Sequence, residues 1–113
     1  MHEYSIVQAL YARVEAEAAA RGATAVHALE LRVGELSGVD AGLLETAWRT
    51  FRVRTICDRA PLTIQIVPAE WACGTCGAPV LKGAVLSCAS CGSPARLRQG
   101  DEIVLDRIEL EVP

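Results

Sequence analysis

The chain has few aromatic residues and no long apolar run. It contains one Phe, two Tyr and two Trp among 113 residues, so its core must be built mainly from Leu, Val, Ile and Ala. It has no stretch of 18 consecutive apolar residues, which argues against a membrane-spanning helix. The first residues lack the basic start and apolar stretch of a signal peptide, and we therefore expect a cytoplasmic protein.

The chain also lacks an excess of basic residues and any recognisable catalytic constellation. The formal net charge is −3, whereas general nucleic-acid binding requires a basic surface. No Ser/His/Asp or Cys/His arrangement is apparent, so we expect a protein that is not an enzyme. A metal, or another protein, remains as the expected ligand.

Hydrophobic periodicity predicts the first half of the fold. Apolar residues recur at helical spacing over residues 4–21, and Gly22 is placed to end that helix. Residues 27–36 alternate between apolar and polar, which is typical of a half-buried strand. Asp40 is suited to cap a second helix at residues 41–53.

Further alternation predicts two more strands with a different kind of segment between them. One strand covers residues 62–66 and the other begins near 103. Residues 70–99 are rich in small residues and cysteine and have few large apolar side chains, with short strands expected near Val80. The expected fold is α/β, with two helices on a small three-stranded sheet and an inserted zinc-ribbon-like module. We place an α/β domain at 1–69 plus 100–113.

Four of the five cysteines form two C-x-x-C pairs: Cys73, Cys76, Cys88 and Cys91. Two cysteines three apart on a tight turn can present both sulfurs to one ion, and a second such turn completes a tetrahedron. This is the pattern of a four-thiolate zinc site, which is coordinatively closed and usually structural. Two disulfides or a dithiol redox pair are the alternatives, although disulfides require an oxidising compartment.

The amino terminus is a second candidate metal site. The amine of Met1, the amide nitrogen of His2 and the His2 imidazole can close adjoining chelate rings on one ion, with Glu3 as a further ligand. Nitrogen-rich, near-planar coordination suits Ni(II) or Cu(II) better than Zn(II). A histidine at position two is nevertheless often part of a frayed terminus without a role.

Three stretches of the chain form a recognisable set of motifs. They are Met1-His2-Glu3-Tyr4-Ser5-Ile6, the segment Leu31-Arg32-Val33-Gly34-Glu35-Leu36-Ser37-Gly38-Val39-Asp40, and Ile66-Val67-Pro68 leading into Cys73-Gly74-Thr75-Cys76-Gly77. Together they resemble the HypA/HybF family of nickel metallochaperones for [NiFe] hydrogenase maturation. The resemblance covers essentially the whole chain in the same order.

The resemblance implies a protein with two metal sites. His2 would bind Ni(II), the transferred cargo, together with the Met1 amine, while Glu3 and Asp40 would belong to the nickel site or its surroundings. Zn(II) would be structural and held by the four paired cysteines. The implied partners are a nickel-handling GTPase and the hydrogenase large subunit, and some family members also serve urease. A homodimer is an additional possibility.

The residues themselves leave one alternative function open, which is a zinc-ribbon adaptor that binds protein without transferring nickel. A nucleic-acid version of that adaptor is disfavoured, because Lys82 is the only basic residue between the first and last paired cysteine. The remaining thiol, Cys57, is expected to be a half-buried bystander. His27 has no ligand partner nearby in the sequence.

Overall fold

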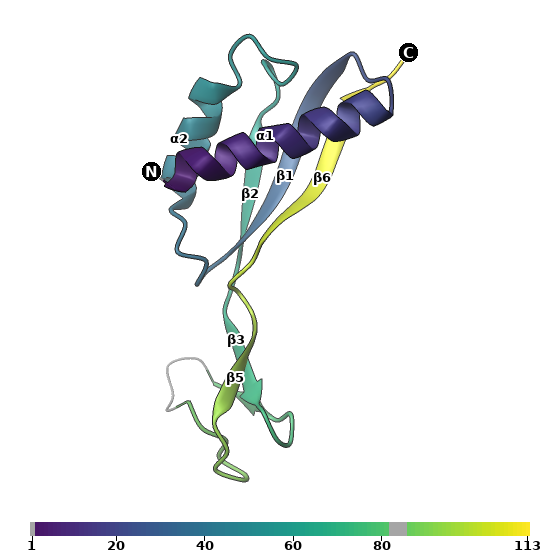
Figure 1. The fold of residues 1–113 in the computed structure, drawn as a ribbon. Coiled ribbons are helices and arrows are strands. Elements are labelled where there is room, and N and C mark those ends of the chain that lie inside the picture. The colour runs from purple at the N-terminus through teal and green to yellow at the C-terminus, as the bar shows by residue number, and fades with distance from the viewer. Residues whose placement is uncertain (1, 82–85) are drawn as a thin grey trace. The chain divides into compact units, whose positions relative to one another are not determined.

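The computed structural model describes residues 2–81 and 86–113 (Figure 1). Its elements are α1 (His2–Ala20), β1 (Ala25–Gly34), α2 (Ala41–Phe51), β2 (Leu62–Val67), β3 (Glu70–Cys73), β4 (Pro79–Val80), β5 (Ala95–Gln99) and β6 (Ile103–Glu111). Met1, an expected nickel ligand, lies outside the described residues. None of the helices described is long and apolar enough to cross a bilayer.

The first sheet has the strand order β2-β1-β6, which confirms the expected three-stranded sheet. Leu29 N donates to Pro61 O, and six residues further along both strands Glu35 N donates to Val67 O. Since the partners advance together, β1 and β2 are parallel. A parallel pair requires a crossover connection, and α2 forms it.

Strand β6 pairs with the other edge of β1 in the opposite direction. Thr24 N donates to Glu111 O, whereas Gly34 N, at the far end of β1, donates to Glu102 O. Gly34 also allows a close backbone approach, because a Cβ there would lie 2.2 Å from the carbonyl carbon of Gly100. Only glycine fits at that position without displacing backbone.

The helices form the core of this α/β layer with the apolar side chains of β1. In Figure 1, α1 crosses over the strands, and it also contacts α2. The buried side chains are Val7, Leu10, Val14 and Ala18 of α1, Val26, Leu29, Leu31 and Val33 of β1, and Leu44 and Trp48 of α2. Each large side chain buried in this way contributes about 1.5–3 kcal/mol. The predicted stop is also confirmed, since Gly22 follows α1 with φ +64°.

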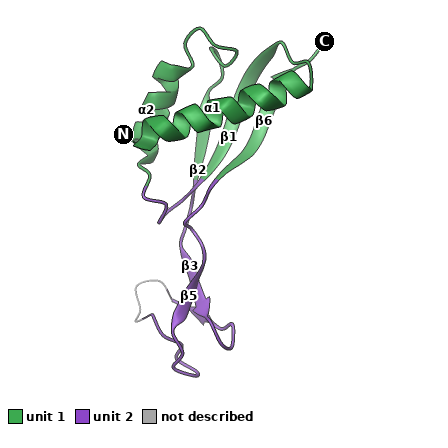
Figure 2. Cartoon of the chain, in the orientation of Figure 1, with its two compact units in different colours: residues 1–32, 39–65, 104–113 green, residues 33–38, 66–103 purple. Residues whose placement is uncertain are grey.

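The chain divides into two compact units, which Figure 2 colours separately. Unit 1 comprises Met1–Arg32, Val39–Gln65 and Val104–Pro113. Unit 2 comprises Val33–Gly38 and Ile66–Ile103. Unit 2 therefore extends beyond the module expected at 70–99, because it also includes residues 33–38, 66–69 and 100–103, which the sequence pattern placed in the α/β domain.

Unit 2 contains a second sheet with the order β4-β3-β5. Both pairings are antiparallel, with Trp71 opposite Val80 and Ala72 opposite Arg96. Val80 thus lies in a short strand, as expected. Strands β3 and β5 flank the paired cysteines and are additions that the sequence pattern did not predict.

Candidate metal centre

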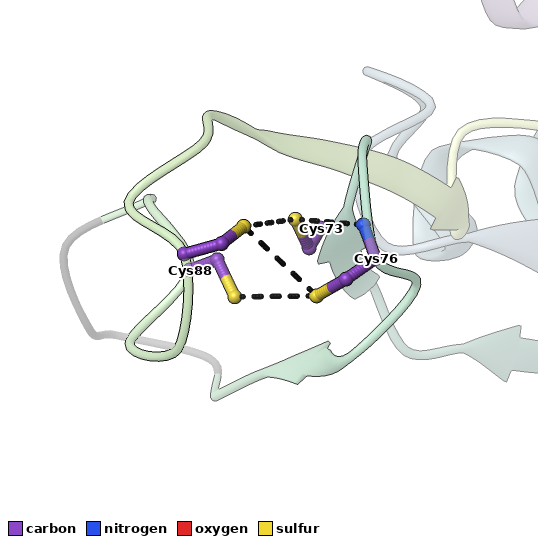
Figure 3. A group of neighbouring side chains, drawn as sticks. Cys73, Cys76 and Cys88 are labelled. Carbon is purple, nitrogen blue, oxygen red and sulfur yellow. Dashed lines mark hydrogen bonds between the residues drawn. The ribbon is translucent and has the colours of Figure 1, made fainter.

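The four paired cysteines meet at one point in unit 2. Their sulfur atoms all lie within 4.8 Å of one another, and Figure 3 shows Cys73, Cys76 and Cys88 converging. The Sγ separations are 3.3 Å between Cys73 and Cys91, 3.6 Å between Cys76 and Cys88, and 4.0 Å between Cys76 and Cys91. A tetrahedron with zinc–sulfur bonds of about 2.3 Å has sulfurs about 3.8 Å apart. The cluster therefore fits a zinc ion.

The first C-x-x-C turn follows directly from the end of β3. Its backbone folds back on Cys73, so that Gly77 N donates to Cys73 O at 3.1 Å. Thr75 N and Cys76 N both donate to Cys73 Sγ at 3.3 Å. Amide donors aimed at a sulfur stabilise its thiolate form, which is the form that binds metal.

The second turn repeats this arrangement. Gly92 N donates to Cys88 O at 2.8 Å, and Ser90 N donates to Cys88 Sγ at 3.4 Å. The two pairs are therefore the same structural motif used twice, which explains why their sequence spacing is identical. The sulfur separations exceed the disulfide bond length of about 2.05 Å, and all five cysteines are free. The disulfide alternative is thus excluded for this structure.

Hydrogen bonds from backbone amides give the thiols of the cluster different pKa values. Amide donation from Cys76 and then Thr75 lowers the pKa of Cys73 to about 6. Donation from Cys91 and Ser90 lowers the pKa of Cys88 in the same way. The amide of Ala78 lowers the pKa of Cys76, but the neighbouring sulfurs of Cys73 and Cys88 outweigh it, and the pKa rises to about 11. One thiol of each turn is thus prepared to ionise first, and a metal ion would displace the remaining protons.

The expected nickel residues lie at the start of unit 1. His2 opens α1 with its side chain 61% exposed, and its Nε2 lies 3.7 Å from Glu3 Oε2. Glu3 is only 8% exposed, and the same carboxylate oxygen accepts a hydrogen bond from Asp40 N at 3.3 Å. The buried carboxylate therefore connects the first turn of α1 to the residue before α2.

Asp40 uses its own carboxylate for a different contact. Its Oδ1 accepts from Leu43 N at 3.0 Å, which confirms the predicted helix cap. Among residues 2–81 and 86–113, the four cysteines are the only group of three or more potential ligands gathered closely enough to hold an ion. Glu3 thus contacts the His2 ring and the backbone amide of Asp40. These described residues do not by themselves form a group of ligands that could hold an ion.

Three further side chains make structural contacts or are buried. His27 Nε2 lies 2.8 Å from Glu111 Oε1 at the exposed pairing of β1 with β6. Glu35 Oε1 accepts from Ala69 N at 2.7 Å. Cys57 was expected to be half-buried, but it is fully buried. Burial, followed by the charge of Glu15, raises the pKa of its thiol to about 11.

Comparison with known proteins gives one consistent result. Residues 1–110 match the model of a family described as HypA, hydrogenase/urease nickel incorporation, metallochaperone. Hydrogenase maturation factor HypA of Shewanella baltica is 38% identical over 113 residues, covering 98% of this chain and 97% of that protein. The corresponding factor of Wolinella succinogenes is 39% identical over 114 residues, covering 98% and 96%.

Solved structures agree with the sequence relatives. The solution structure of the Ni metallochaperone HypA from Helicobacter pylori superposes with a TM-score of 0.74 at 30% identity, covering 98% of both chains. A second solution structure, of HypA protein, gives a TM-score of 0.81 at 31% identity, covering 100% of this chain and 98% of that one.

Proposed function

The chain belongs to the HypA family of nickel-incorporation metallochaperones, and from that premise we propose that its amino terminus binds Ni(II) through His2. Membership makes it a nickel-handling protein of hydrogenase maturation and not an enzyme. The proposal adds the location of the Ni(II) site and the groups that bind the ion. It also favours a carrier over an adaptor that transfers no nickel.

The start of α1 supports this location. The first four amide groups of a helix have no carbonyl partner within the helix. The amide nitrogens of His2 and Glu3 can therefore be given to a metal without breaking a helical hydrogen bond. The exposed His2 imidazole adds a further nitrogen, and the Met1 amine completes the proposed set. Such a nitrogen-rich set favours Ni(II).

The contact between Glu3 and Asp40 is the observation that carries the proposal. A carboxylate that is 8% exposed is unusual at a chain terminus. Its oxygen lies between the His2 ring and the Asp40 amide, and so it fixes the first helical turn in place. We assign Glu3 to orienting His2 and Asp40 to orienting Glu3, so that of these three residues His2 alone supplies a side-chain ligand.

The cysteine cluster is proposed to hold structural Zn(II). Four thiolates leave no open position for water or substrate, so this ion would stabilise unit 2 and perform no chemistry. Nickel, in contrast, must leave again. A terminal site allows this, because ligands at a chain end can detach one at a time.

The proposed recipients are the [NiFe] hydrogenase large subunit and a nickel-handling GTPase that acts with it. The curated relatives named above are all hydrogenase maturation factors, which makes hydrogenase the first target. Urease is a proposed second target, since the family description includes it. Self-association as a homodimer is also proposed, to be tested by mass measurement in solution.

Selective acetylation of the terminal amine tests the proposed ligand set. Acetylation removes one nitrogen ligand and leaves every side chain intact. We expect the acetylated, zinc-loaded chain to bind Ni(II) at least about tenfold more weakly than the free-amine chain, because a ligand of the chelate is lost. Equal affinity, with an unchanged absorption spectrum of the nickel complex, would rule out the amine as a ligand.

A further inference from the structure

A cavity in unit 2 combines two arginines with the first cysteine turn. It has a volume of about 380 Å³ and is lined by Ala72, Cys73, Gly74, Gly77, Arg96 and Arg98. We refer to it as the arginine cavity. Arg96 and Arg98 both belong to β5 and line the same cavity. The pairing of β5 with β3 shifts at Arg98, because Trp71 lies opposite Leu97 while Glu70 lies opposite Gln99.

Neither guanidinium has a partner in the described part of the chain. Both side chains are exposed, and neither forms an ion pair or a hydrogen bond there. In unit 1, by contrast, Arg32 pairs with Asp106 and Arg107 pairs with Glu30 and Glu109. The two arginines of the cavity therefore keep all their donors for an external ligand.

Arg96 and Arg98 do not donate hydrogen bonds to the cysteine sulfurs. The donors to Cys73 Sγ are the backbone amides of Thr75 and Cys76, not a guanidinium. Arg96 instead covers Gly74, where a Cβ would lie 2.8 Å from Arg96 Nε. This close cover makes one wall of the cavity and places a guanidinium beside the turn.

We propose that the arginine cavity binds carboxylate side chains of an acidic segment in a partner protein. Guanidinium groups form paired, charge-assisted hydrogen bonds with carboxylates, and two of them lining one cavity suit two acidic side chains. A nucleic acid fits less well, because Glu70, Asp101 and Glu102 belong to the same unit and a phosphate backbone requires several cations. A protein occupant also agrees with a role in maturation, which requires protein partners.

This inference is independent of nickel, so its failure would leave the proposed nickel site standing. The test uses the full-length, zinc-loaded chain and the peptide acetyl-Glu-Gly-Glu-Gly-Glu-amide, followed by NMR at the arginine Nε–H groups. The peptide with Gln at each Glu position and inorganic phosphate serve as comparison ligands. We expect the acidic peptide to shift the Nε–H signals of Arg96 and Arg98 saturably, and the Gln peptide to leave them unchanged.

Substitution separates the arginines from a general charge effect. Arg98→Gln should weaken peptide binding by about threefold to fivefold, as expected for loss of one exposed charge pair. Arg59→Gln, which removes an exposed and unpaired arginine from unit 1, should bind as the parent chain does. Arg96→Gln should weaken peptide binding to a similar extent. Because Arg96 also covers Gly74, this variant could misfold, and in that case the result for Arg98→Gln is decisive.

Three results would overturn the proposal. The first is no saturable binding of the acidic peptide, or binding that Arg98→Gln leaves intact. The second is binding of phosphate without the peptide, which would assign the cavity to a phosphate ligand. The third is loss of zinc from Arg98→Gln, which would make the arginines part of the metal centre.

Discussion

At the scale of single residues, Asp40 makes two contacts through different atoms. Its carboxylate caps α2 by accepting from Leu43 N, whereas its backbone amide donates to Glu3. A side-chain change should therefore alter the stability of α2 while leaving the link to Glu3. This division of roles distinguishes a residue that would position the proposed nickel site from one that would bind nickel itself.

Substituting Asp40 tests that division. Asp40→Ala should lower the free energy of unfolding by about 1 kcal/mol, the usual cost of losing a helix cap. Asp40→Asn should retain most of the stability, since Asn also caps helices well. Denaturant unfolding measures both, and nickel titration of the Asn variant provides the second readout. Unchanged nickel affinity is expected, and a large loss would make the carboxylate a ligand.

Cys57 links pH to stability through its buried thiol. Its pKa is raised from 9.0 to about 11 in the folded chain, first by burial and then by the charge of Glu15. The folded state therefore holds the proton more tightly than the unfolded state. The stabilisation is complete below pH 9 and is lost as pH rises from 9 towards 11, with a slope of about 1.4 kcal/mol per pH unit.

The measurement is the free energy of unfolding of the parent chain and of Cys57→Ala at several pH values in that window. Cys57→Ala leaves a cavity, so the variant will be less stable than the parent chain at every pH. The comparison therefore uses the slope of the free energy of unfolding against pH. We expect the parent chain to lose stability more steeply than the variant. Parallel slopes would mean that Cys57 ionises equally readily in both states.

At the scale of elements, the two C-x-x-C turns hold unit 2 together. Strand β4 has two residues and β3 has four, so these strands bury little surface of their own. Cys91→Ser should release the metal and unfold unit 2, because binding to a closed thiolate site is coupled to folding. Unit 1 should stay folded, since its apolar core lies around α1, α2 and β1.

Metal analysis together with amide hydrogen exchange, resolved by residue, checks this expectation. Cys57→Ala is the matched control, because it also removes a thiol but one outside the cluster. It should retain the full metal content. Loss of protection throughout unit 1 in Cys91→Ser would show that the two units do not fold separately.

Sequence alone predicts the elements whose pattern reflects burial. The helices α1 and α2 and the strand β1 follow from apolar periodicity, and the Asp40 cap follows from its side-chain chemistry. The thiolate cluster follows from spacing. Strands β3 and β5 were missed because they are short and lie next to the two C-x-x-C turns. The alternation of Arg96 and Arg98 was a usable signal of a strand with a polar face.

The environment of Glu3 could not be predicted either. It depends on a hydrogen bond between residues 37 positions apart, whose donor is a backbone amide and carries no sequence signature. The same limit applies to Cys57, whose complete burial depends on the packing of unit 1 around it. Both features require the three-dimensional arrangement of unit 1.

At the scale of the whole molecule, the proposed carrier has a releasable metal site in unit 1 and a closed metal site in unit 2. Amine and imidazole nitrogens must lose protons before they bind nickel. Nickel affinity should therefore fall as pH drops from about 7.5 to about 5.5, because protons compete with the metal for these nitrogens. Calorimetric titration across that range measures this, and constant affinity would contradict release by protonation.

The most direct test of the central claim is a calorimetric nickel titration of the zinc-loaded chain with a native, untagged amino terminus, compared with His2→Ala and His27→Ala. His27 is the only other histidine and pairs with Glu111 on the sheet. Stoichiometric binding that His2→Ala abolishes and His27→Ala preserves is the predicted result. Equal binding by the parent chain and His2→Ala would contradict a nickel site at the amino terminus.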